Sequence, residues 1–188
     1  DMLRLAGVPD TDLYRAVKDT VRARIPWLLV NMGTAILASS VIGLFEATLE
    51  KIVALAVLMP IVAGLGGNAG TQTLAVAVRG LATKELDSDN ALRVIGKEVL
   101  VGCINGIVLA CIIGPIAWAW FDMPMVGAII GAAVVFNLLL AGLMGSLIPL
   151  TLEKFDVDPA VASSIFLTMC TDSLGFFAFL GLATLFLL

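Results

Sequence analysis

Five long apolar runs dominate this chain, and each of them is long enough to cross a lipid bilayer. They cover residues 26–45, 52–78, 99–121, 123–152 and 159–188. About 20 consecutive apolar residues span the hydrocarbon core as a helix, because a helix satisfies every backbone polar group within its own segment. The sequence therefore predicts an all-α polytopic membrane protein with five transmembrane helices per protomer.

The composition agrees with this class and argues against an enzyme. Hydrophobic residues make up 60% of the 188 residues and charged residues 14%, whereas a soluble domain averages about 45–50% and about 25%. The chain has no histidine, which excludes a Ser-His-Asp or Cys-His nucleophile, a histidine metal site and a histidine proton relay. The net charge of −4 argues against nucleic acid as a partner and is compatible with a cation.

A basic, amphipathic segment precedes the first apolar run. Residues 11–24 place Leu13, Val17 and Val21 on one stripe, with charged residues elsewhere, which predicts a short amphipathic helix at a membrane surface. The chain begins with Asp1 instead of methionine and has no signal-peptide pattern, so we expect it to be a piece of a longer protein.

The distribution of Lys and Arg predicts the orientation in the membrane. The N-terminal segment holds five of them, the long connection at 79–98 holds four and the connection before residue 159 holds one, whereas the opposite side holds only Lys51. Because cytoplasmic loops carry the excess of basic residues, the N-terminus is predicted to be cytoplasmic and the C-terminus external, in the plasma (inner) membrane. Residues 1–25 are then a connecting segment at the cytoplasmic surface, and residues 26–188 are a five-helix transmembrane pore domain.

One acidic residue, Asp172, lies near the centre of an apolar run. A carboxylate at this depth costs at least a few kcal/mol, and ion or proton pathways are its usual role. No basic residue lies at the same depth, so we expect a mobile cation as its partner; a protonated Asp172 that fastens two helices is the alternative. Ser164 and Thr168 share its helix face, with Thr171 and Gly175 beside them. This small, hydroxylated stripe is a candidate lining for a water-filled path.

Residues 60–73 form a glycine-rich stretch in the middle of the second run. Its glycines are Gly64, Gly66, Gly67 and Gly70, and its neutral polar side chains are Asn68, Thr71 and Gln72. Glycines and Pro60 weaken a helix, and irregular backbone at membrane depth occurs where it is buried in protein or faces a water-filled cavity. The stretch therefore predicts an irregular pore helix that presents uncharged oxygens, and close helix contact through the glycines is the alternative.

Small residues also recur every four positions in the third run. They are Gly102, Gly106, Ala110 and Gly114, and the fourth run has Gly127 and Gly131. Residues of this kind and spacing predict helix-packing faces and imply no direct chemistry.

Two of these motifs resemble the membrane domain of the MgtE family of magnesium channels and transporters. They are residues 60–72 followed by Arg79 and Gly80, and residues 168–177 around Asp172. Residues 24–28 and 43–46 are similar as well, so the resemblance covers essentially the whole chain. It implies a homodimer of five-helix protomers, a pore along the dimer axis and Mg²⁺ bound by Asp172 of both subunits. It also implies upstream cytosolic regulatory domains that are absent from this chain.

The residue chemistry suits magnesium as the transported and bound ion. Mg²⁺ prefers oxygen ligands and keeps its waters, so one carboxylate per subunit with hydroxyls and amides fits a largely hydrated ion. The residues do not separate Mg²⁺ from Mn²⁺, Co²⁺ or Ni²⁺. The expected function is a magnesium channel or transporter; the alternatives are a proton-coupled secondary transporter of divalent metal and a structural membrane assembly module.

Overall fold

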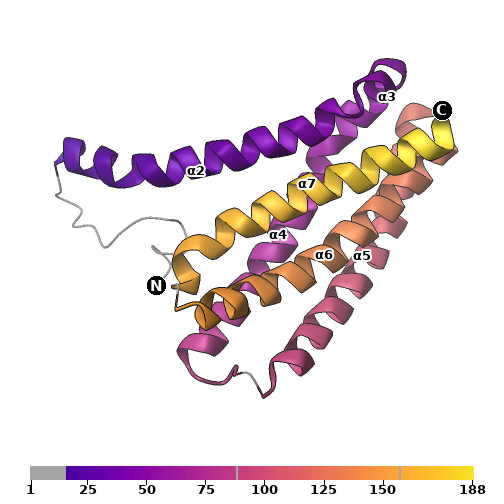
Figure 1. The fold of residues 1–188 in the computed structure, drawn as a ribbon. Coiled ribbons are helices and arrows are strands. Elements are labelled where there is room, and N and C mark those ends of the chain that lie inside the picture. Colours follow the sequence, from indigo (N-terminus) through magenta and orange to yellow (C-terminus); the bar gives the residue numbers. More distant parts are fainter. Residues whose placement is uncertain (1–15, 88, 157) are drawn as a thin grey trace.

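The computed structural model describes residues 16–87, 89–156 and 158–188, and these residues form helices joined by short connections (Figure 1). The helices are α2 (Val17–Gly43), α3 (Glu46–Lys51), α4 (Val53–Ala82), α5 (Ala91–Phe121), α6 (Pro124–Lys154) and α7 (Pro159–Leu187). Five of them, all except α3, are long and apolar enough to cross a membrane. The prediction of an all-α protein with five transmembrane helices is confirmed.

The helices extend beyond the apolar runs at several ends. α2 begins at Val17 and continues through residues 25 and 26 without a break. The described part of the expected amphipathic helix is therefore the first turns of α2 and not a helix of its own; residues 11–15 of that segment lie outside the described residues. The short helix α3 was not predicted from the sequence.

The connection predicted at residues 79–98 is much shorter in the structure. α4 continues to Ala82 and α5 already begins at Ala91. Helix α4 ends where Lys84 adopts a left-handed conformation with φ 57°, and the backbone N–H groups of Glu85 and Leu86 then bond to the carbonyl of Gly80. The predicted connection was too long, because polar residues at the ends of spans remain helical once these terminal hydrogen bonds are satisfied.

Helix α6 is the centre of the bundle, and it packs against α4, α5 and α7. Its side chains are the most buried of any long helix in the described residues. On α5, Gly106 lies so close to α6 that a Cβ there would be 2.9 Å from the Cα of Val135, and a Cβ at Gly114 would be 3.2 Å from the carbonyl oxygen of Gly127. The predicted packing faces are therefore the contact between α5 and α6.

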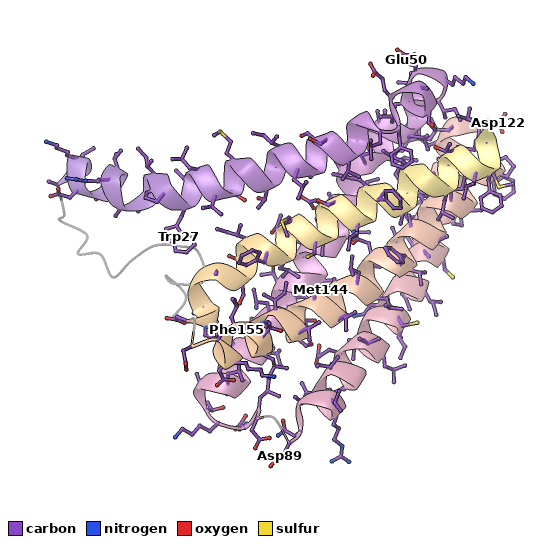
Figure 2. The ribbon with its side chains drawn as sticks, viewed as in Figure 1. Trp27, Glu50, Asp89, Asp122, Met144 and Phe155 are labelled. Carbon is purple, nitrogen blue, oxygen red and sulfur yellow. The ribbon has the colours of Figure 1, made fainter. Side chains whose placement is uncertain are left out.

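The connections gather at two opposite ends of the bundle. Figure 2 shows Glu50 and Asp122 near the C-terminal end of α7, and Asp89 and Phe155 at the other end. Helix α2 diverges from the bundle towards its N-terminal end (Figure 1). Near its C-terminal end it meets α7, where the rings of Phe45 and Phe177 pack edge to face with centroids 5.7 Å apart.

Candidate membrane ion site

Asp172 lies in the middle of α7, a helix whose start is well defined by its sequence. Asp158 caps the helix, because its Oδ1 accepts a hydrogen bond of 2.9 Å from the backbone N–H of Ala160. Pro159 occupies the first turn, where its missing N–H has no cost. From there α7 continues for 29 residues and carries no charged residue except Asp172.

The side chain of Asp172 is half-buried, and no other described residue forms a hydrogen bond or an ion pair with it. Ser164 and Thr168 lie on the same side of the helix, and Thr168 is exposed on the protomer surface. Within the described ranges, no group of three or more Cys, Asp or Glu side chains gathers to hold a metal ion. One protomer therefore offers a single carboxylate at this depth.

Thr171 and Gly175, which were expected beside Asp172 on the lining stripe, face the interior of the protomer. Thr171 is 0% exposed, and its hydroxyl donates to the carbonyl of Leu167 at 3.1 Å. Gly175 packs against the amide of Asn137. The two residues therefore do not lie on the surface where Thr168 is exposed, because α7 packs against α4 and α6 at their positions.

The glycine-rich stretch of α4 is a regular α-helix, so the expected irregular backbone is absent. Gly66 and Gly70 are buried where other helices press against α4. A Cβ at Gly66 would lie 2.7 Å from Cγ of Asn137, and a Cβ at Gly70 would lie 2.9 Å from Cδ1 of Leu167. These two glycines provide space for neighbouring side chains, which is the helix-contact alternative, and the helix keeps its own hydrogen bonds.

Gly64 and Gly67 lie on the other side of α4, where a Cβ would meet no atom within 4 Å. The neutral side chains are exposed on this side, and they belong to Asn68, Thr71 and Gln72. The exposed Thr71 hydroxyl donates to the carbonyl of Gly67 at 2.8 Å, so its oxygen can still accept a hydrogen bond. We call this surface, formed by Gly64, Gly67, Asn68, Thr71 and Gln72, the open face of α4.

Two packing contacts set the relative level of α4 and α7, which run in opposite directions (Figure 1). Gly70 meets Leu167, and Gly66 meets the same Asn137 side chain that Gly175 contacts. Residues 66–70 of α4 therefore lie across from residues 167–175 of α7. Asn68 and Asp172 each fall between these contacts, so the amide and the carboxylate are at the same depth in the bundle.

No role was assigned from the sequence to two buried polar residues that link helices, Asn137 and Glu98. Asn137 is 0% exposed in the middle of α6, and its Nδ2 donates to the carbonyl of Val62 at 2.9 Å. Glu98 is also buried, and its Oε2 accepts a hydrogen bond of 3.2 Å from Thr73 of α4. Asn137 had a detectable signal, since it is the lone amide in the apolar run 123–152. Glu98 had none, because it directly precedes an apolar run and resembles a solvated end residue.

These features define a class, namely a polytopic helical membrane protein with an acid and neutral polar side chains in the middle of its long apolar helices. Comparison with known proteins adds the family: the MgtE model, described as a divalent cation transporter, matches residues 59–182. The chain belongs to the MgtE family, and the resemblance found in the sequence is confirmed.

Three relatives, each named magnesium transporter MgtE, are similar to this chain. The Bacillus subtilis protein is 34% identical over 164 residues, which is 87% of this chain and 36% of the relative. The Enterococcus faecalis protein is 35% identical over 187 residues, 100% of this chain and 41% of the relative. The Thermus thermophilus protein is 32% identical over 191 residues, 100% of this chain and 42% of the relative. The chain thus spans less than half the length of these relatives.

Proposed function

We propose that this chain is the membrane part of a magnesium transporter, in which Asp172 binds the hydrated ion as it crosses the bilayer. The observation that carries the proposal is the Asp172 carboxylate at mid-depth, half-buried and without a partner among the described residues. An acid in that position is expensive unless a cation or water meets it. The relatives named magnesium transporter MgtE support Mg²⁺ as that cation.

The neutral side chains give the path its remaining ligands. Mg²⁺ gives up its waters reluctantly, so hydroxyl and amide oxygens serve best as acceptors from the ion's water shell. On α4 these groups belong to Asn68, Thr71 and Gln72, and on α7 to Ser164 and Thr168. Oxygen ligands of this kind also accommodate Mn²⁺, Co²⁺ and Ni²⁺.

A second copy of the chain completes the path in this proposal. One protomer contributes one carboxylate, and its polar open face is unfavourable against lipid. A two-fold axis beside α7 doubles the carboxylate and covers the open face of α4 at the same time. The orientation we propose places the N-terminal end of α2 and the connection between α4 and α5 in the cytoplasm, because the N-terminal segment holds five basic residues and residues 79–98 hold four.

The proposal is tested by Mg²⁺ flux into liposomes that contain the full-length protein and a magnesium-sensitive dye. Asp172→Asn keeps the shape of the side chain and removes its charge, and we expect it to lower flux by about tenfold or more. The matched control is Asp122→Asn, because Asp122 lies in the connection after α5 with φ 54°, a conformation that asparagine adopts equally well.

Wild-type flux in Asp172→Asn, with flux in the control unchanged, would contradict the proposal and leave Asp172 as a structural residue. Flux that requires a proton gradient would identify a coupled carrier instead of a channel.

A further inference from the structure

The side chain of Asn137 joins three helices at the depth of the proposed ion site. Its Nδ2 donates to the carbonyl of Val62 on α4. One turn further along α4, Gly66 packs directly against the amide. From α7, Gly175 packs against it as well, since a Cβ at position 175 would be 2.7 Å from Nδ2. The amide is therefore enclosed by α4 on one side and α7 on the other.

The Asn137 amide is only half satisfied in its hydrogen bonds. The Oδ1 of Asn137 is buried and has no hydrogen-bond partner among the described groups. A buried acceptor without a partner costs about 1–3 kcal/mol. A leucine has the same branched outline and no unpaired acceptor, but it is larger and makes no hydrogen bond to Val62. The unpaired Oδ1 is a cost that comes with the amide at this position.

The two helix segments that Asn137 contacts also carry polar groups of the proposed path, Asn68 on α4 and Asp172 on α7. Gly66 lies two residues before Asn68, and Gly175 lies three residues after Asp172. A displacement of the Asn137 amide therefore moves both the open face of α4 and the carboxylate of α7. Oxygen ligands, water included, lie about 2.0–2.1 Å from Mg²⁺ and about 2.3–2.6 Å from Ca²⁺. The water shells of the two ions therefore differ in radius by a few tenths of an ångström, and a shift of that size in the path is comparable to this difference.

We propose that Asn137 is a positioning residue that sets the separation between Asn68 and Asp172, and through it the preference of the path for Mg²⁺ over larger divalent cations. This inference rests on the proposed function, because it assigns to Asn137 the geometry of that same site. Asn137 does not touch the ion; it acts through the helices that it contacts.

The test measures the ratio of Mg²⁺ to Ca²⁺ flux in liposomes, together with thermal stability in detergent, for the full-length protein. Asn137→Leu removes the amide and keeps the branched outline of the side chain, whereas Gly175→Ala keeps the amide and adds a methyl group that presses on it from α7. We expect both variants to change the flux ratio by about threefold or more. The matched control is Gly96→Ala on α5, where a Cβ meets no atom within 4 Å, and it should leave the ratio unchanged.

A double variant separates positioning from general disturbance. Asn137→Ser shortens the side chain and makes room for the methyl group of Gly175→Ala, so the pair together should restore part of the wild-type ratio that Gly175→Ala loses. If Asn137→Leu does not fold, the flux ratios of Gly175→Ala alone and of the double variant test the proposal in its place.

The outcomes distinguish the two proposals. If the folded variants at positions 137 and 175 keep the wild-type ratio while Asp172→Asn abolishes flux, Asn137 only fills space, and this inference is overturned while the proposed function stands. If Asp172→Asn carries Mg²⁺ at the wild-type rate, the proposed function fails, and the positioning role fails with it.

Discussion

Replacing Gly142 of α6 with alanine is expected to weaken the packing of α5 on α6. A Cβ at position 142 would lie 2.5 Å from the carbonyl oxygen of Glu98 and 3.0 Å from its carbonyl carbon, whereas ordinary contact begins at 3.4 Å. The two helices must therefore separate locally by about 0.9 Å. The obstructing atoms belong to the backbone of α5, so no side-chain rotation relieves the contact.

The magnitude follows from two opposing terms. Overpacking of this kind costs about 1–3 kcal/mol, and alanine in a helix interior gains about 0.5–1 kcal/mol over glycine. Gly96→Ala on α5 gains the helix propensity of alanine without the overpacking cost, because a Cβ there meets no atom within 4 Å. The free energy of unfolding should therefore be about 1–3 kcal/mol lower for Gly142→Ala than for Gly96→Ala.

The assay is reversible unfolding of the full-length protein in mixed detergent micelles, followed by the fluorescence of its tryptophans. Two of the three, Trp118 and Trp120, lie on α5, and Trp118 packs against Gly127 of α6, so that its fluorescence reports on the separation of the two helices. Equal unfolding free energies for Gly142→Ala and Gly96→Ala would refute the argument, because they would show that α5 and α6 do not make the contact described here.

Three further predictions concern the proposed transport path. Gln72→Ala and Thr168→Ala should change conductance or ion preference by modest factors and not abolish flux, since neutral groups contribute no net charge; flux lost completely in a folded variant of either kind would move the main site away from Asp172. Acidic pH should slow Mg²⁺ flux, because protons compete for the oxygens of Asp172, and raising Mg²⁺ should reverse the effect; inhibition that Mg²⁺ does not relieve would contradict this. Cysteines introduced at positions 84 and 188, with the native cysteines replaced, should react with impermeant reagents from opposite sides of the membrane, and labelling from one side would contradict the five-span orientation.

The five transmembrane helices could be predicted from the sequence because the bilayer imposes length and composition on each segment separately. The same is true of Asp172 as a candidate site, since a carboxylate in the middle of an uncharged run is costly wherever the neighbouring helices lie. Glycine spacing on α5 likewise indicated a packing face, which the structure identifies as the contact with α6. Each of these inferences depends on one stretch of chain and its solvent.

The tertiary structure decided everything that depends on a partner far along the chain. The four glycines at positions 64–70 of α4 divide into a buried pair and an open pair because Asn137 and Leu167 press on one side of that helix. Thr171 and Gly175 belong to the interior because α7 turns that side towards α4 and α6. Asn137 itself was a lone amide in an apolar run until α6 placed it between Val62 and Gly175. The physical reason is that helical periodicity defines the faces of a helix, while the neighbouring helices determine which face each one covers.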